Sequence, residues 1–160
     1  MYKSLAEKAF AQMSDEDLTL QLDEESNSVA QIVKHMAGNM RSRWTDFLTT
    51  DGEKPNRNRD SEFVDAPADR PAMMALWNAG WAVVFSAINP LSDADLTRTV
   101  TIRGEPHSVM QAIQRQVAHY AMHVGQIVFI AKNLRSMGWR SLSIPKHEIA
   151  TKEPGERKRR

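Results

Sequence analysis

The sequence predicts an all-α protein: a four-helix bundle with a long crossover loop and a small β-hairpin before the last helix. Three observations predict it. Apolar residues recur at alternating steps of three and four in three long segments, which is the period of an amphipathic helix. Each segment follows a residue suited to cap a helix, and each is followed by a Gly or Asn-Pro stop signal.

The clearest helix is expected over residues 108–136. Ser108 and Gln111 have the spacing of a capping box, and Pro106 lies just upstream. Gly138 provides the stop. The apolar stripe between them consists of Val109, Ile113, Val117, Tyr120, Val124, Ile127, Ala131 and Leu134.

A second helix is expected over residues 28–50. Ser28 and Gln31 form another capping box, and the turn dipeptide Asp51-Gly52 closes the segment. Its apolar stripe consists of Val29, Ile32, Val33, Met36, Met40, Trp44, Phe47 and Leu48.

Residues 54–69 are polar and contain two prolines, so they are expected to form a long surface crossover of the kind that often borders a site. Asp69 is expected to cap a third helix, with Pro71 in the first turn and Asn89-Pro90 as the stop. The residues expected to face inward are Met74, Trp77, Trp81, Val84, Phe85 and Ile88.

The other segments are expected to be short. Residues 2–13 form a stunted first helix, and a connection over residues 14–25 tucks in its leucines 18, 20 and 22. Residues 96–105 alternate threonine with Val and Ile, as in a small hairpin. We therefore expect one domain over residues 1–150 and a disordered, charged tail over residues 151–160.

Composition narrows the function. The chain has 160 residues, 21 Lys plus Arg and 20 Asp plus Glu, so no net field attracts nucleic acid or an anionic membrane. It has no cysteine, which excludes disulfides, thiolate metal sites and a thiol nucleophile. Its N-terminus does not resemble a signal peptide, and no run of about 18 apolar residues occurs. The cytoplasm is the expected location.

Three histidines are the candidate metal ligands. His119 and His123 lie four residues apart and share one face of the last predicted helix. His35 lies beside the apolar stripe of the second predicted helix, so it is also expected at the inward edge of its helix. Three imidazoles leave a metal ion an open position for water or substrate, as in catalytic zinc sites, although nickel and cobalt accept the same ligands. The alternative is a set of ordinary core or surface histidines. His107 and His147 are expected to be bystanders.

Further residues have less specific signals. Asn39 and Gln126 could orient the metal ligands or the water bound to the metal. The alternatives are that Asn39 is an ordinary packed amide and that Gln126 is an ordinary solvated one. Arg43 could bind a substrate carboxylate, but an ordinary surface arginine is favoured. Trp44, Trp77 and Trp81 could line a pocket. A place in the core is favoured, because aromatic residues at helical spacing are more often core residues.

Segments 28–39, 43–53, 104–113 and 119–127 resemble the DinB/YfiT-like superfamily, in a branch known only as a domain of unknown function. The most specific mark is the HxxxHxGQ pattern over residues 119–126, preceded by a distant helical histidine. The resemblance spans roughly residues 2–134. It implies a four-helix bundle, commonly a homodimer, in which His35, His119 and His123 bind a divalent metal. Zinc or nickel is favoured over cobalt, manganese or iron. The short first helix departs from the family pattern.

Some members of this superfamily are S-transferases or isomerases that use a low-molecular-weight thiol, one has been treated as a metal-dependent hydrolase, and many have no known reaction. The resemblance therefore favours a metalloenzyme that activates a small thiol for transfer to a small-molecule substrate. The alternatives are a metal-dependent hydrolase and a non-catalytic, stress-related metal-binding dimer. Nucleic-acid binding by the basic residues 157–160 is the weakest hypothesis.

Overall fold

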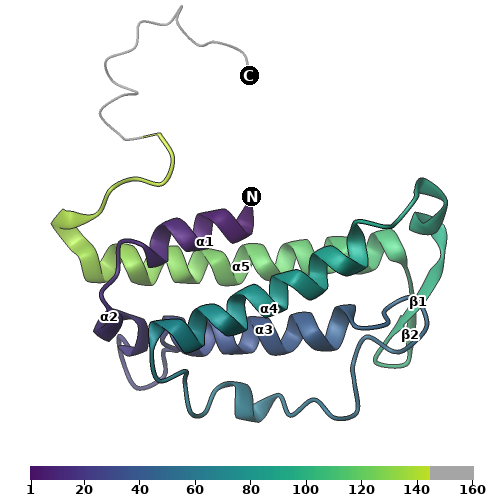
Figure 1. The fold of residues 1–160 in the computed structure, drawn as a ribbon, viewed down its shortest axis with the longest axis horizontal. Helices are drawn as coiled ribbons and strands as arrows, with labels where there is room; N and C mark the ends of the chain where they lie inside the picture. The colour runs from purple at the N-terminus through teal and green to yellow at the C-terminus, as the bar shows by residue number, and fades with distance from the viewer. Residues whose placement is uncertain (145–160) are drawn as a thin grey trace, which may run out of the picture.

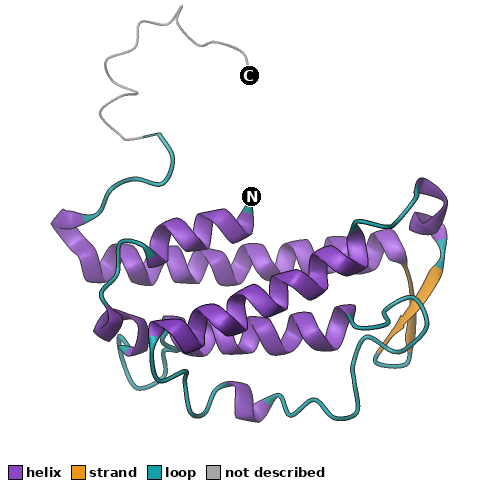
Figure 2. Cartoon of the chain, viewed as in Figure 1, coloured by secondary structure: helices purple, strands orange, loops and turns teal. Residues whose placement is uncertain are grey.

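The computed structural model describes residues 1–144 and is mostly helical, with one two-stranded sheet (Figures 1 and 2). The α-helices are α1 (Tyr2–Phe10), α2 (Asp15–Thr19), α3 (Val29–Trp44), α4 (Arg70–Ile88) and α5 (Val109–Arg135). Short 3-10 helices are η1 (Asp60–Glu62), η2 (Asp93–Thr97) and η3 (Ser136–Gly138), and the strands are β1 (Thr99–Ile102) and β2 (Glu105–Ser108). The predicted charged tail, the end of the predicted domain and His147 lie outside the described residues.

The three long helices begin where the capping residues predicted. The Ser28 hydroxyl accepts a hydrogen bond from the Gln31 backbone N–H, and the Gln31 side chain accepts one from the Ser28 N–H in return. Ser108 and Gln111 make the same capping box at the start of α5. Asp69 caps α4 by accepting from the Ala72 N–H at 2.8 Å. These hydrogen bonds confirm the three predicted caps. Each cap stabilises its helix, because it satisfies an N–H group that has no partner within the helix.

The end of α3 was predicted wrongly, since the helix stops at Trp44 rather than near residue 50. Thr45 is extended and Asp46 has a positive φ of 49°. Three threonine side chains in residues 45–50 donate to nearby backbone carbonyls. Such local bonds compete with helical pairing, so the chain turns although Phe47 remains buried.

The segment before α3 also differs from the prediction. Ser14 and Asp17 form a capping box that starts the short helix α2, which was expected to be an irregular connection. Leu18 is buried on this helix, but Leu20 and Leu22 are 50% and 37% exposed. Their inward placement was therefore wrong.

The predicted hairpin is confirmed and extends to Ser108. Its strands pair antiparallel from Thr99↔Ser108 to Ile102↔Glu105. Arg103 and Gly104 both have positive φ, 56° and 78°, as a two-residue turn of this kind requires. The Asp51 carboxylate accepts from the backbone N–H groups of both turn residues, at 2.9 and 2.8 Å. The hairpin is thereby joined to the loop that follows α3.

The helices enclose one core. α4 packs on α3 and crosses in front of it in Figure 1, while α1 lies along α5. Gly80 permits the close approach of α4, because a Cβ there would lie 3.2 Å from the Cα of Ala37. The buried residues of α4 are Met73, Trp77, Gly80, Trp81 and Val84. Phe85, expected inside, is 44% exposed, and Met73 is buried more completely than Met74.

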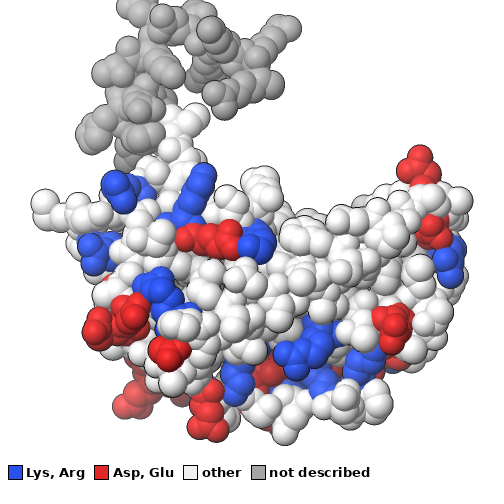
Figure 3. Space-filling model, in the orientation of Figure 1, with Lys and Arg blue, Asp and Glu red and all other residues white. Residues whose placement is uncertain are grey.

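One surface of α4 carries no charge. Between Arg70 and Asp93 the chain has no Lys, Arg, Asp or Glu, and Figure 3 shows a band without these residues over this helix. Its exposed residues include Ala72, Ala75, Ala79, Ala82 and Ser86. Within residues 1–144, α4 is also the one helix long and apolar enough to cross a membrane by length and composition, a test that core helices of soluble proteins also pass.

Candidate metal centre

The three predicted histidines converge between α3 and α5. Nε2 of His119 lies 3.4 Å from Nε2 of His35 and 3.1 Å from Nε2 of His123. One ligand nitrogen from each ring lies within 4.8 Å of the other two. The predicted adjacency of the two helices at these positions is confirmed. His107, on β2, donates from Nδ1 to the Glu105 carbonyl oxygen of its own strand and lies outside this group.

Two of the rings make a hydrogen bond through Nδ1, the nitrogen that faces away from the cluster. Nδ1 of His35 donates to the Glu62 carboxylate at 2.9 Å, and Nδ1 of His123 donates to the Gln126 side-chain oxygen at 2.8 Å. A proton held on Nδ1 leaves a lone pair on Nε2. The lone pairs of His35 and His123 therefore point toward the shared space, as in metal sites where outer partners orient the histidines.

This donor set fits a divalent cation. Nitrogens about 2.0–2.1 Å from a tetrahedral zinc lie about 3.4 Å apart, close to the two separations measured from His119. Burial, with the neighbouring His123 and His35, lowers the pKa of His119 to about 3. Burial also lowers the pKa of His123. Both rings are therefore neutral near pH 7, as metal ligands must be.

Glu62 is a direct contact of the histidine cluster that the sequence did not indicate. It lies in the segment expected to be a solvated crossover, yet it is only 5% exposed. The Arg57 guanidinium donates to both of its carboxylate oxygens, at 2.9 and 2.8 Å. Burial alone would raise the pKa of Glu62, but its hydrogen bonds from His35 and Arg57 outweigh burial and lower it. The sequence around Glu62 does not indicate that this residue is buried. The only general expectation that points to it is that a metal-ligating histidine donates its second ring N–H to an acceptor such as a carboxylate.

Gly38 makes room for that carboxylate. A Cβ at this position would lie 2.1 Å from Oε1 of Glu62. The glycine stands one helical turn from His35 on α3, so a side chain there would displace the acceptor that orients His35. The close approach explains a glycine in the middle of a helix.

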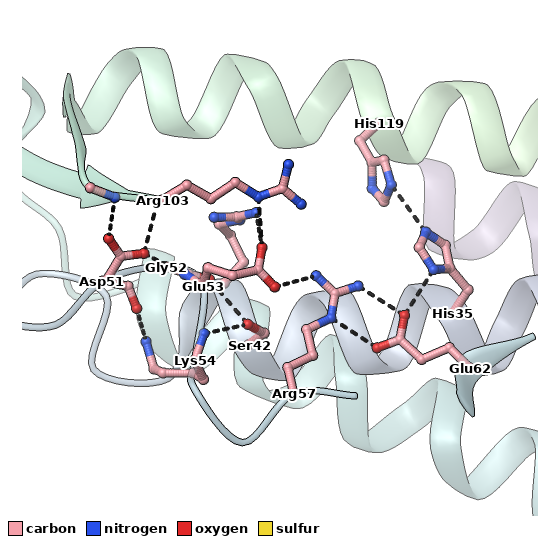
Figure 4. A network of polar contacts seen from close by, with 12 residues as sticks. His35, Ser42, Asp51, Gly52, Glu53, Lys54, Arg57, Glu62, Arg103 and His119 are labelled. Atoms are coloured by element: carbon pink, nitrogen blue, oxygen red, sulfur yellow. Dashed lines mark hydrogen bonds and ion pairs between the residues drawn. The ribbon is translucent and has the colours of Figure 1, made fainter. Parts of the chain in front are cut away.

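Charged side chains continue from Glu62 to the hairpin, as Figure 4 shows. Arg57 also donates to Glu53 at 3.2 Å, and Glu53 accepts from Arg103 at 3.1 Å. Arg43 lies 3.6 Å from the same Glu53 carboxylate. The series ties the hairpin turn to the histidine cluster through alternating charges.

Of the two amides predicted to assist the histidines, one contacts a histidine and the other does not. Gln126 contacts His123 as described, whereas Asn39 is buried with its Oδ1 unpaired among the described residues. Arg43 is only 5% exposed, so its expected surface position was wrong. Its Nε and Nη1 atoms, and Oε1 of the buried Gln116, also have no partner within residues 1–144. Asn39 and Arg43 follow His35 on α3 at steps of four residues, and Gln116 precedes His119 on α5 by three, so these groups lie beside the histidines.

The tryptophans belong to the core, as the favoured interpretation held. Trp44, Trp77 and Trp81 are at most 6% exposed. Trp44 donates to the Tyr120 hydroxyl at 2.7 Å, and burial raises the pKa of that hydroxyl. Trp81 packs against Tyr120 with ring centroids 5.4 Å apart. These rings support the helix that carries His119 from its inner side.

Residues 1–148 match the family model described as Protein of unknown function (DUF1572), a DinB/YfiT-like family. The chain belongs to this family. The DUF1572 match covers all ten elements of the structure, including both helices of the histidine cluster. No curated protein matches the chain.

Proposed function

We propose that this DUF1572 protein is a metal-dependent enzyme that transfers a low-molecular-weight thiol to a small electrophilic substrate. The convergence of His35, His119 and His123 carries the proposal. We also propose that its helices form a four-helix bundle of the DinB type, which the resemblance implies. Zinc or nickel is the favoured ion, with cobalt, manganese or iron as alternatives, because imidazole nitrogen suits all of them.

The three Nε2 atoms would hold the ion. When bound by three neutral imidazoles, a divalent ion keeps its full charge and lowers the pKa of a thiol or water that occupies its open position. Glu62 keeps the proton of His35 on Nδ1, and Gln126 does the same for His123. Arg57 keeps Glu62 ionised. The chain has no cysteine, so the thiol must come from a second substrate.

The state of Glu62 favours thiol transfer over hydrolysis. Hydrolysis benefits from a carboxylate that accepts a proton from water near pH 7. Glu62, the carboxylate in contact with the cluster, is bound by both Arg57 and His35, and its pKa is lowered. A thiol is already much more acidic than water and needs less help from such a base.

Asn39 and Gln126 are proposed to assist from the outer shell. Gln126 orients His123 through its side-chain oxygen. Asn39 stands one turn beyond His35 on α3 and has an unpaired buried oxygen, which would accept a hydrogen bond from a polar group of the substrate. We further propose that the protein is a homodimer in the cytoplasm, and the uncharged face of α4 supports an interface between copies.

The test is turnover by protein purified without a metal-binding tag and loaded with zinc or nickel. Glutathione and cysteine serve as thiol probes with 1-chloro-2,4-dinitrobenzene as the electrophile, and p-nitrophenyl acetate tests hydrolysis. We expect metal-dependent loss of thiol that His119→Ala abolishes. Metal-dependent ester cleavage alone would support a hydrolase. Stoichiometric metal with no turnover of either panel would support the non-catalytic metal-binding dimer.

A further inference from the structure

A groove of about 510 Å³ lies beside the metal centre. Ile32 of α3 and Gly125, Gln126 and Phe129 of α5 form one side, and the loop before α3, with Leu22 and Glu25, forms the other. Leu22 and Phe129 are 37% and 65% exposed. The volume falls in the range of small-molecule sites, and large apolar side chains facing such a hollow are typical of them.

Gly125 indicates that the groove is kept open. A glycine in the middle of a helix destabilises the helix relative to alanine. Gly38 and Gly80 have neighbours that a Cβ would strike, but a Cβ at Gly125 would meet no atom within 4 Å. Packing among the described residues therefore does not require this glycine, whereas a ligand lying against the backbone of α5 would.

The groove reaches the metal centre through Gln126. This side chain lines the groove while its oxygen accepts from His123 at 2.8 Å. Ile32, which lines the same side of the groove, stands one helical turn before His35. A molecule in the groove therefore lies directly behind two of the three candidate ligands.

The charge of the groove selects the ligand. Glu25 is the only charged side chain among the described residues that line it, and Asp23 and Glu24 precede Glu25 in the same loop. The Asp23 carboxylate is occupied by Ser26 and by the Glu25 backbone N–H. Glu25 thus gives the groove its negative charge, and a carboxylate at the edge of a partly apolar hollow complements an ammonium group.

We propose that this groove binds an amine with an apolar body, with the ammonium group at Glu25 and the apolar part between Leu22 and Phe129 over Gly125. The inference that this amine is a substrate rests on the proposed function. The inference that the groove binds an amine does not, because none of the three histidines lines the groove.

The test compares two probes with a phenyl body and opposite charge, phenethylammonium and 3-phenylpropionate, by NMR titration at low salt. We expect the ammonium probe to bind about fivefold more tightly, since an exposed carboxylate contributes up to about 1 kcal/mol. Glu25→Gln should remove this preference. Gly125→Trp should weaken both probes at least tenfold by filling open space, while Gly125→Ala should weaken both by a smaller factor, because its Cβ meets only the ligand that lies over the backbone.

Three results would overturn the proposal: equal affinity of the two probes for the native protein, unchanged affinity in Gly125→Trp, or no binding of either probe. If neither probe binds and Gly125→Trp changes the sedimentation coefficient from that of a dimer to that of a monomer, a second copy covers the groove. His119→Ala separates the two proposals. Probe binding retained in this variant supports the groove even if thiol transfer is never observed.

Discussion

Nδ1 of His35 lies 2.9 Å from the carboxylate of Glu62, a residue 27 positions later in the chain. Both side chains are more than 90% buried. The contact fixes the proton of the His35 ring on the side away from the other histidines, and Arg57 fixes the carboxylate in turn. The outer contacts of His35 thus come from the crossover between α3 and α4.

The first prediction concerns the central ligand. His119→Ala should reduce bound metal from about one ion per chain to background, because His119 is the ring within 3.4 Å of both others. Helix content by circular dichroism should remain. His107→Ala is the matched control and should retain the ion in elemental analysis. Full occupancy of His119→Ala would contradict the assignment of the site.

The second prediction separates orientation from stability at Glu62. Glu62→Gln should weaken metal binding about 10- to 100-fold through loss of its hold on His35. It should also destabilise the protein by up to about 3 kcal/mol, because the buried Arg57 loses one of its two charged partners and keeps only Glu53. The double variant Arg57→Met, Glu62→Gln should recover stability in urea but not metal affinity. Recovery of both in the double variant would show that the role of Glu62 is structural alone.

The third prediction compares two glycines that both lie inside helices. Gly38→Ala should weaken metal binding at least tenfold and lower the free energy of unfolding, because the new Cβ displaces the Glu62 carboxylate. Gly125→Ala should raise the free energy of unfolding by roughly 0.5–1 kcal/mol, because its surroundings are open. Competition with a chromophoric chelator and urea titration measure the two effects. Equal stabilisation by both substitutions would refute the close approach at Gly38.

The fourth prediction is a pH dependence of the metal-free protein. The pKa of His119 is about 3 in the folded chain and near 6.5 when unfolded, so between these values the unfolded chain binds more protons. Stability should therefore fall as pH falls from 6.5 toward 3. The slope should be less than about 1.4 kcal/mol per pH unit, because the ring is partly exposed.

Urea unfolding with a chelator at pH 7, 5.5 and 4.5 measures this slope. His119→Gln is the control, because its amide does not titrate, and its slope should be shallower than that of the native chain. Parallel slopes for the two proteins would mean that His119 does not resist protonation in the folded state.

The fifth prediction concerns the uncharged face of α4. If the protein is a homodimer through this face, Ala79→Arg should yield monomers in sedimentation velocity, because a buried unpaired guanidinium opposes association. Ala68→Arg, in the exposed loop before α4, should leave the dimer intact. Dimers that persist in Ala79→Arg would place the interface elsewhere.

Much of the fold follows from local signals. Ser28, Asp69 and Ser108 determine where the long helices start, and each acts within its first turn. The convergence of His35 with His119 was also predictable, since both stand at inward edges of long helices. The end of α3 was not, because side chains such as Thr45 return to the backbone and outweigh an apolar pattern that continues to Leu48.

The outer contacts of the centre were less accessible to prediction. Glu62 and Arg43 look like solvated charges in sequence, and only tertiary packing buries them. A buried charge depends on distant partners such as Arg57 and Glu53, which no helical period reveals. Gly38 likewise has no local explanation until the crossover is placed against α3.

His35 and His119 are separated by 84 positions, and neither α3 nor α5 carries all three histidines. The ligand set therefore exists only after the chain has closed a long loop, which has an entropic cost. An ion that binds this set but not the unfolded chain would shift the folding equilibrium by mass action. Under that coupling, scarcity of such an ion would shorten the lifetime of the folded protein, so that the abundance of the protein would follow the supply of the ion.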